Sequence, residues 1–171
     1  MRDIDPDKIT YRPFESEEDL QVIVKMMKQA LSEPYPIYTY RYFVQKWPEL
    51  TIMAMYEGEC IGCIVSKLEN EQKNEGLRYR GYIAMLAVDP TRRRCGLGRK
   101  LVQMTIDDMH KAGADECILE TELDNQAALN LYECKFSLRI NTSFSNGFLA
   151  RQTPPGLLFK WQRRIQTETN V

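Results

Sequence analysis

The sequence predicts a single α/β or α+β domain built on a mixed sheet. Segments with a strand-like apolar pattern alternate along the chain with segments whose apolar residues recur every three or four positions. The length of 171 residues suits one domain with one core, and no repeat, low-complexity tract or linker divides the chain. We expect the domain to span residues 1–162 and residues 163–171 to form a C-terminal tail.

The first half of the chain contains an expected strand, two helices and a hairpin. Residues 9–14 alternate as a strand, and Ser16 is a suitable N-cap for the helix that follows. The apolar residues of that helix repeat at helical spacing: Leu20, Ile23, Val24, Met27 and Leu31. Two prolines then precede a tyrosine-rich helix that runs to Trp47. "TIMAMY" and "CIGCIVSKL", separated by "EGE", predict a hairpin, and the charged "ENEQKNEG" after them is expected to be a solvated loop.

The second half continues the alternation and then loses it. Residues 79–88 end in a continuous apolar run, which is typical of a strand covered on both faces. A helix follows with one apolar face: Leu101, Val102, Ile106 and Met109. Residues 116–123 predict another strand, and residues 125–133 another helix. From residue 134 the signal weakens, and "FSLRI" and "LLFKWQ" are the remaining strand candidates.

Charge and cysteine usage exclude several classes of protein. The net charge of −1 comes from 23 basic and 24 acidic residues, so any anion site must be a local cluster. No apolar run reaches about 18 residues and no secretory leader is evident, so we expect no membrane span. The five cysteines are odd in number, which favours free thiols in a reducing cytosol.

Cys60 and Cys63 form a CxxC pair, which invites a metal or redox interpretation. A zinc site needs about four ligands, whereas the chain has no second CxxC pair and only one histidine, His110. The segment also has the pattern of a strand, in which positions i and i+3 face opposite sides. We therefore expect these cysteines to be small buried apolar residues, and we expect no metal site.

The stretch "VDPTRRRCGLGRK", residues 88–100, has the composition of an anion cradle. Helix N-termini carry unpaired N–H groups and partial positive charge, and glycine lets an anion approach the backbone. The nucleoside triphosphate pattern GxxxxGK[ST] is absent, and GxGxxG fails because Leu101 stands at the third glycine position. A solvated basic surface and a nucleic-acid patch remain alternatives from the residues alone.

The pattern Arg93-x-x-Gly96-x-Gly98 directly after "MLAVDP" resembles the coenzyme A pyrophosphate loop of the GCN5-related N-acetyltransferase (GNAT) superfamily. "LSEPYPIYTYRYFVQKWPEL", "RGYIAMLAVD" and "LETELDNQAALNLYE" look like catalytic subunits of NatC-type N-terminal acetyltransferases, over about residues 10–133. The resemblance implies a mostly antiparallel central sheet with helices on both faces. It also implies two splayed strands that hold acetyl-CoA as co-substrate.

The same resemblance implies which residues bind the coenzyme. Backbone groups of the splayed strand would pair with the pantetheine arm, and the loop after it would wrap the pyrophosphate. An asparagine at the start of the last helix would also contact the coenzyme. In this sequence these are Leu86, Ala87, Val88, Arg93, Arg94, Cys95, Gly96, Leu97, Gly98, Arg99 and Asn125.

Two residues are candidates for proton transfer. A peptide α-amine has a pKa of about 7.7–8.0, so a carboxylate acting through water suffices as base. Glu120 shares one strand face with Ile118, in a strand otherwise fit for burial. An unpaired carboxylate at such a position is unfavourable unless it has a role. By the resemblance, Tyr132 would protonate the coenzyme A thiolate. Tyr132 lies seven residues after Asn125, which predicts one helix face for both.

The resemblance also implies a peptide groove. Glu33 would lie near the substrate amine, and tyrosines would form an apolar slot for the residue after methionine. The candidate substrate-binding residues are Glu33, Pro34, Tyr35, Tyr38 and Tyr82. The alternative for the tyrosine-rich segment is simple packing of its helix on the sheet.

Residues 134–162 depart from the family pattern. The expected Gly-Phe pair and tyrosine-rich hairpin are missing, and no tyrosine follows Tyr132. Divergence, an alternative final exon and a frameshifted end would each explain this. The resemblance implies an acyltransferase that acetylates nascent peptides keeping methionine before a bulky apolar residue. The alternatives are a catalytically impaired variant that binds coenzyme A or auxiliary subunits, and a GNAT enzyme acting on small-molecule amines or lysine.

The expected partners and location follow from the same resemblance. They are nascent polypeptide N-termini, a large and a small auxiliary subunit, and the ribosome. The expected location is the cytoplasm, with the nucleus as a second one. We expect no direct nucleic-acid or membrane binding, since the sequence offers no aromatic stacking platform and no broad basic face.

Overall fold

A computed structural model of the chain describes residues 4–31, 34–73, 76–122, 125–136, 139–141 and 156–162. Their strands form one sheet in the order β1-β2-β3-β4-β5-β7-β6. The strands are β1 (Thr10–Pro13), β2 (Thr51–Tyr56), β3 (Glu59–Lys73), β4 (Gly76–Val88), β5 (Glu116–Glu122), β6 (Arg139–Asn141) and β7 (Gly156–Gln162). The helices are α1 (Glu17–Ala30), α2 (Ile37–Lys46), α3 (Leu97–Lys111) and α4 (Gln126–Phe136). Three short 3₁₀ turns are η1 (Pro6–Lys8), η2 (Pro48–Leu50) and η3 (Pro90–Arg92).

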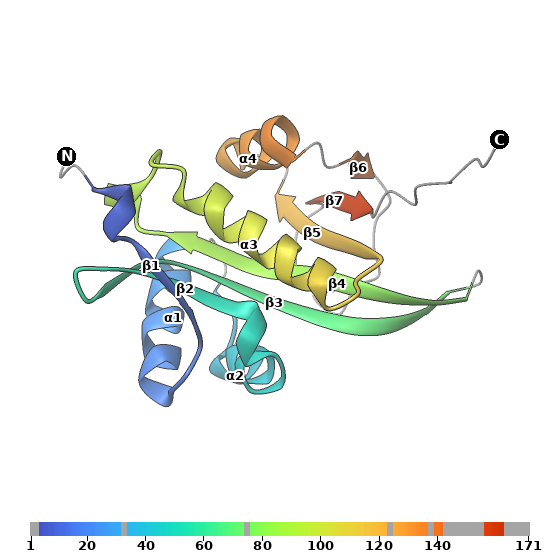
Figure 1. Cartoon of the computed structure of the whole chain (residues 1–171), viewed down its shortest axis with the longest axis horizontal. Helices are drawn as coiled ribbons and strands as arrows, with labels where there is room; N and C mark the ends of the chain where they lie inside the picture. Colours follow the sequence, from blue (N-terminus) through green and yellow to red (C-terminus); the bar gives the residue numbers. More distant parts are fainter. Residues whose placement is uncertain are drawn as a thin grey trace.

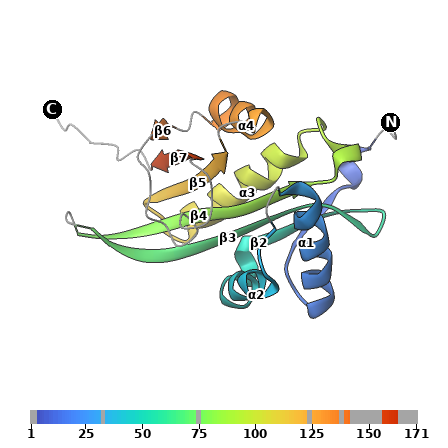
Figure 2. The same ribbon diagram turned by 180° about the vertical axis from the view of Figure 1, so that it is seen from behind.

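Helices cover both faces of this sheet, as predicted. α1 and α2 lie on one face and α3 and α4 on the other, an arrangement seen from both sides (Figures 1 and 2). Every described strand pair is antiparallel except β4 with β5. That parallel pair needs a crossover connection, which α3 supplies. The predicted mixed, mostly antiparallel sheet is confirmed.

The core includes the apolar helix faces read from the sequence, packed against the strands. Leu20, Ile23 and Met27 of α1 are fully buried, as are Leu101 and Met109 of α3. The Ser16 hydroxyl accepts from the Asp19 N–H at 3.4 Å and caps α1 as expected. Among the described residues, no helix is both long and apolar enough to span a membrane.

The β2–β3 hairpin forms as predicted, but the charged loop after it does not. Glu57 and Gly58 both have positive φ, 51° and 85°, which is the two-residue turn that matches the twist of a hairpin. The "ENEQKNEG" stretch continues the strands instead, since β3 runs to Lys73 and β4 begins at Gly76. In this long ribbon the Arg80 guanidinium of β4 forms a diagonal ion pair with Glu71 of β3, and Lys67 pairs with Glu69 within β3. These ion pairs supply what apolar burial does not.

Two register shifts interrupt the sheet, and both lie near the candidate site. Ile83 pairs with Ser66 and Met85 with Val65, so Ala84 is an extra residue in β4. On β3, Ile61 is the extra residue between the pairs formed by Cys60 and Gly62 with β2. A bulge bends its strand, and its extra residue makes the side chains after it point to the face opposite to the one that simple alternation predicts. The expectation that Cys60 and Cys63 face opposite sides was therefore wrong, because the bulge brings both to one face.

The C-terminal segment completes the sheet despite its unusual sequence. "LLFKWQ" is confirmed as a strand, since β7 pairs with β5 from Glu122↔Gly156 to Glu116↔Gln162. The strand predicted from "FSLRI" is shifted, because α4 continues to Phe136 and β6 begins at Arg139. The predicted tail, 163–171, lies outside the described residues.

Candidate functional site

The parallel pair β4–β5 comes apart at the bulge in β4. Pairing runs from Arg80↔Glu116 to Ile83↔Leu119 and stops there, although β4 continues to Val88 and β5 to Glu122. Beyond this point Leu86 and Val88 pair with β3 alone among the described strands. Backbone groups on the β5 side of residues 84–88 thus have no partner among the described strands. An extended ligand can add itself there by main-chain hydrogen bonds.

The loop after β4 presents backbone N–H groups at the start of α3. Gly96 occupies the N-cap with φ of 81°, and no side chain caps the helix. Arg94 also has positive φ, 69°. A methyl group at Gly96 would meet no heavy atom within 4 Å, so the backbone there borders open space. Left-handed residues beside a helix N-terminus form the concave N–H arrangement that binds phosphates.

The arginines and the cysteine of this loop are exposed, as an anion cradle requires. Arg93, Arg94, Cys95 and Arg99 all face solvent. The Cys95 thiol donates to the Arg92 carbonyl at 2.9 Å, and the Arg92 guanidinium lies 5.6 Å from the centre of the Tyr56 ring. Leu97, by contrast, is buried in the core, so only its backbone is available to a ligand.

Asp89 fixes the turn that leads into the loop. Its N–H donates to the Ile61 carbonyl at 3.0 Å. Its carboxylate accepts from the Thr91 N–H at 2.8 Å and the Thr91 hydroxyl at 2.7 Å. The Thr91 hydroxyl bond is the main reason why the Asp89 pKa is lowered, with burial opposing it. The loop is thereby anchored to the bulge of β3.

The start of α3 also approaches β4 and α4 closely. A methyl group at Gly98 would lie 3.6 Å from Leu131 of α4 and 3.7 Å from Val88 of β4. Leu86 and Val88 therefore point to the α3–α4 face. The predicted coenzyme-binding residues of β4 and of the loop lie in one continuous region.

Glu120, Tyr82 and Tyr35 meet on the opposite face. Tyr82 pairs with Ile118, and Glu120 follows two residues later on the same face of β5. Burial, the Glu120 carboxylate and Tyr35 together raise the pKa of the Tyr82 phenol. Glu120 is half-buried, at the point where the two strands separate.

Tyr132 lies on the other face of the sheet, beside Cys117 of β5. Its side chain on α4 is buried, with 6% exposed. Burial, with a smaller contribution from Cys117, raises the pKa of Tyr132 to about 12. Cys117 alternates with Ile118 along β5, so Tyr132 and Glu120 lie on opposite sides of the sheet. The structure thus places a carboxylate on one face of the sheet and a neutral phenol on the other.

Some predicted site residues are placed differently from the expectation. Asn125 lies before α4 rather than in it, and its side-chain oxygen accepts from the Ala128 N–H at 3.1 Å. The predicted shared helix face of Asn125 and Tyr132 was therefore wrong, because Asn125 is a cap. Pro34 is exposed and Tyr38 is 71% exposed, and neither is seen to join the Tyr35–Tyr82–Glu120 group. Glu33 lies outside the described residues.

Lys67 is a neighbour of this group that the sequence analysis missed. It pairs with Tyr82 across β3 and β4, and its ammonium lies 5.8 Å from the centre of the Tyr82 ring. A lysine inside the apolar run "IVSKL" was the available signal. Within the described residues, no group of three or more His, Cys, Asp and Glu side chains is arranged to hold a metal ion.

Comparisons with known proteins agree on one family. The family model "Acetyltransferase (GNAT) family" matches residues 20–136. N-alpha-acetyltransferase 30 of Xenopus laevis is 49% identical over 127 residues, which cover 74% of this chain and 45% of that protein. The Saccharomyces cerevisiae protein of the same name is 44% identical over 144 residues, covering 80% of each. The chain spans less than half the length of the vertebrate relatives it matches.

Solved structures give the same result at the level of the fold. A chain of the structure titled "Crystal structure of the NatC complex bound to Gag peptide and CoA" matches with a TM-score of 0.75 and 41% identity. The match covers 90% of this chain and 96% of that one. Arabidopsis thaliana Naa50 with a bisubstrate analogue matches with a TM-score of 0.74 and 22% identity, which supports the fold alone.

Proposed function

We propose a function on the premise that the chain belongs to the acetyltransferase (GNAT) family, which its match over residues 20–136 shows. The proposal is N-terminal acetyl transfer from acetyl-CoA to the α-amine of peptides that begin with methionine and a bulky apolar residue. The identity to N-alpha-acetyltransferase 30 proteins supports it. A related chain at 41% identity comes from a NatC complex with bound peptide and CoA, which adds further support.

One observation carries the proposal. The gap between β4 and β5 opens beside the anion cradle, with Glu120 on one side of the sheet and Tyr132 on the other. Acetyl transfer to an amine needs a group that accepts a proton and a group that supplies one to the leaving thiolate. Two such groups on opposite sides allow the amine and the thioester to approach through the gap from different faces.

The roles of the residues follow from their positions. The N–H groups around Gly96 and the guanidinium groups of Arg93 and Arg94 bind the diphosphate of the coenzyme. The β5 side of residues 84–88 holds the pantetheine arm by main-chain hydrogen bonds. Glu120 accepts the amine proton, directly or through water, as the new amide bond forms. Tyr132 donates its phenolic proton to the thiolate, and with a pKa of about 12 it keeps that proton at neutral pH.

The substrate, partners and location belong to the same proposal. Tyr35 and Tyr82 line the amine side of the gap, where they offer aromatic surface to an apolar N-terminal side chain. The chain works with a large and a small auxiliary subunit, at the ribosome and in the cytoplasm. The pairing of β7 with all of β5 supports a complete catalytic sheet despite the divergent C-terminal sequence.

A peptide panel with acetyl-CoA tests the proposal. Peptides starting Met-Leu, Met-Lys and Ser are compared, with and without the auxiliary subunits. Preference for Met-Leu supports the proposal. Faster acetylation of free polyamines or internal lysines would identify a different acceptor, and complex formation without transfer would identify a non-catalytic subunit.

A further inference from the structure

Cys60 and Cys63 form a pair of thiols that the proposed function does not use. Both lie on the α1–α2 face because the bulge at Ile61 removes the alternation that would separate them. The Cys63 thiol is fully buried, and its hydrogen bond with the Cys60 thiol is the largest influence on the pKa of both groups. The Cys60 thiol donates to the Met26 sulfur of α1 and to the Gly62 carbonyl oxygen, each at 3.3 Å. This is a compact sulfur cluster rather than a lone cysteine.

The two thiols differ in accessibility and in pKa, as the two cysteines of a reactive pair do. Cys60 is half-buried, so a small reagent can reach it, whereas Cys63 is inaccessible. The hydrogen bond with Cys63, helped by the nearby Arg12, lowers the pKa of Cys60. The same bond, together with burial, raises the pKa of Cys63. A thiolate with an adjacent thiol is the arrangement in which oxidation proceeds to a disulfide.

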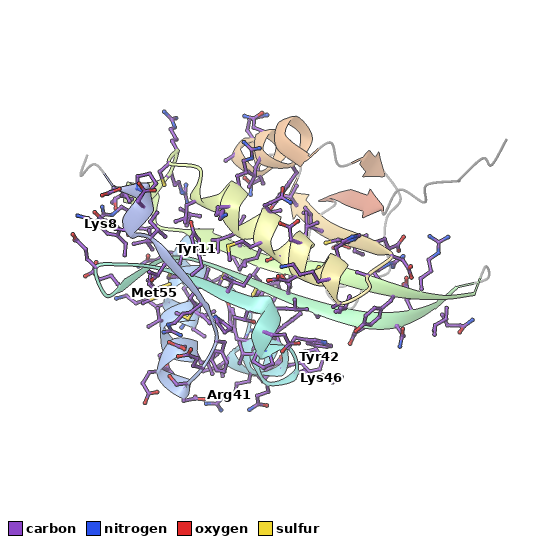
Figure 3. The ribbon with its side chains drawn as sticks, viewed as in Figure 1. Lys8, Tyr11, Arg41, Tyr42, Lys46 and Met55 are labelled. Carbon is purple, nitrogen blue, oxygen red and sulfur yellow. The ribbon has the colours of Figure 1, made fainter. Side chains whose placement is uncertain are left out.

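The pair is also joined to the coenzyme cradle through the two residues between its members. The Ile61 carbonyl accepts from the Asp89 N–H at 3.0 Å. Gly62 pairs with Val88, and a methyl group at Gly62 would lie 3.0 Å from Leu97 at the start of α3. Met55, the strand partner of Cys60, lies at the same end of the molecule as Lys8 and Tyr11, and β4 ends there too (Figures 1 and 3). A change in the bulge therefore acts on the strand end and helix start that form the cradle.

We propose that Cys60 and Cys63 form a reversible disulfide when the protein meets a peroxide, and that this disulfide weakens coenzyme A binding. The Cys60 thiolate attacks one peroxide oxygen, so an S–O bond forms, the O–O bond breaks and hydroxide leaves. The sulfur is oxidised and the peroxide is reduced. Cys63 then attacks the Cys60 sulfur, the S–S bond replaces the S–O bond, and water leaves with the Cys63 proton. The formation of the disulfide is independent of the proposed function, and only its effect on coenzyme A binding rests on that function.

The physical reason for weaker binding is the shape of a disulfide. Linking two cysteines restricts their Cα atoms to about 4.4–6.8 Å and fixes the torsion between the sulfurs. The segment between them must adjust, and Gly62 already has little room beside Leu97 and Leu101. We expect the oxidised protein to bind coenzyme A roughly tenfold more weakly, a coupling of ordinary size between linked sites.

The experiment uses the full chain with Cys134 replaced by serine, and Cys95 is retained because it belongs to the coenzyme cradle. Every comparison is made within this background. After hydrogen peroxide and then iodoacetamide, mass spectrometry examines tryptic peptide 47–67, which contains both cysteines. The expected product lacks two hydrogen atoms, takes up no alkyl group and is reversed by dithiothreitol. Calorimetry with coenzyme A is run on the reduced, oxidised and re-reduced protein.

Matched variants separate the outcomes. Cys63→Ala, or Cys60→Ser where the buried change impairs folding, removes the disulfide, and its coenzyme A affinity is expected to be insensitive to peroxide. Oxygen added to Cys60 or Met26 while Cys63 remains alkylatable would overturn the proposal. A disulfide that leaves coenzyme A affinity unchanged would overturn its second part. Reduced protein that binds no coenzyme A would instead count against the proposed function, while the mass spectrum still tests the disulfide.

Discussion

Glu120 and Tyr132 both lie against β5 but belong to different faces of the sheet. The carboxylate lies with Tyr82 and Tyr35 on the face covered by α1 and α2. The phenol lies with Cys117 on the face covered by α3 and α4. Neither side chain can therefore replace the other, since each is reached from its own side. In the proposed reaction, this separation puts the base on the amine side and the acid on the thioester side.

Tyr132→Phe is expected to reduce kcat by roughly a hundredfold, the usual contribution of a positioned proton donor. The affinity for acetyl-CoA is expected to remain, because only the hydroxyl is lost from a buried ring. Because the pKa of Tyr132 is about 12, the phenol stays protonated, and the wild-type kcat should not fall through its deprotonation between about pH 6 and pH 9. Stopped assays on a Met-Leu peptide and calorimetry with acetyl-CoA measure the two quantities. Tyr79→Phe, the same deletion elsewhere on β4, is the control, and unchanged turnover in Tyr132→Phe would exclude the assigned role.

Gly96→Ala separates backbone strain from ligand contact. Gly96 and Gly58 have φ of 81° and 85°, and a methyl group at either position meets no heavy atom within 4 Å. Both substitutions should lower the free energy of unfolding by about 1–2 kcal/mol, the usual penalty for a side chain in the left-handed region. Only Gly96→Ala should also raise KM for acetyl-CoA, because its methyl group occupies the approach to the N–H groups of the cradle. Urea unfolding and steady-state kinetics on both variants check this, and an equal KM in the two would refute the cradle.

At the level of elements, one ion pair joins β1 to α1. The Arg12 guanidinium donates to both carboxylate oxygens of Asp19, at 2.7 and 2.6 Å. The Glu15 N–H donates to the same carboxylate at 3.0 Å. The side chain of Asp19 is 9% exposed and that of Arg12 32%. The contact with Arg12 lowers the pKa of Asp19, so this pair makes stability depend on pH.

The sign of that dependence follows from linkage. A lowered pKa in the folded state stabilises the protein at pH values above the unfolded pKa, and the stabilisation is lost as pH falls through the folded pKa. Asp19→Asn should be less stable than wild type by about 1–2 kcal/mol at pH 7. The difference should shrink below about pH 4. Urea unfolding at several pH values measures it, with Asp107→Asn on exposed α3 surface as control, and a constant difference would argue against the ion pair.

The elements that the sequence predicted are those with strong local patterns. The apolar faces of α1 and α3 and the "EGE" turn predicted their structures because spacing and turn chemistry act within a few residues. The bulges at Ile61 and Ala84 had no comparable signal, since any residue can be the extra one in a strand. The gap between β4 and β5, and the shared face of Cys60 and Cys63, depend on those bulges. Asn125 is a different case, because asparagine is a preferred N-cap residue and the sequence did carry the signal that would have placed it before α4.

At the scale of the whole molecule, a net charge of −1 means that anion binding depends on one loop rather than on the overall field. The exposed Arg93, Arg94 and Arg99 supply that local charge. The sequence predicted this loop because its arginines and glycines are consecutive along the chain. It predicted Glu120 from a carboxylate inside a strand fit for burial, and Tyr132 only by resemblance, because the packing of α4 against β5 has no local signal in the sequence.

Acetyl-CoA binding should stabilise the whole fold, since the cradle exists only when β4, α3 and the β3 bulge are in place. At a ligand concentration of about 100 times Kd, the stabilisation is about 2.7 kcal/mol, or roughly 5–10 °C in Tm for a domain of this size. S-acetyl pantetheine, which has the thioester arm but no diphosphate, should raise Tm much less at the same concentration. Differential scanning calorimetry with both ligands makes the comparison. Equal shifts would mean that the loop contributes nothing to binding, because the two ligands share every other group that the gap between β4 and β5 can hold.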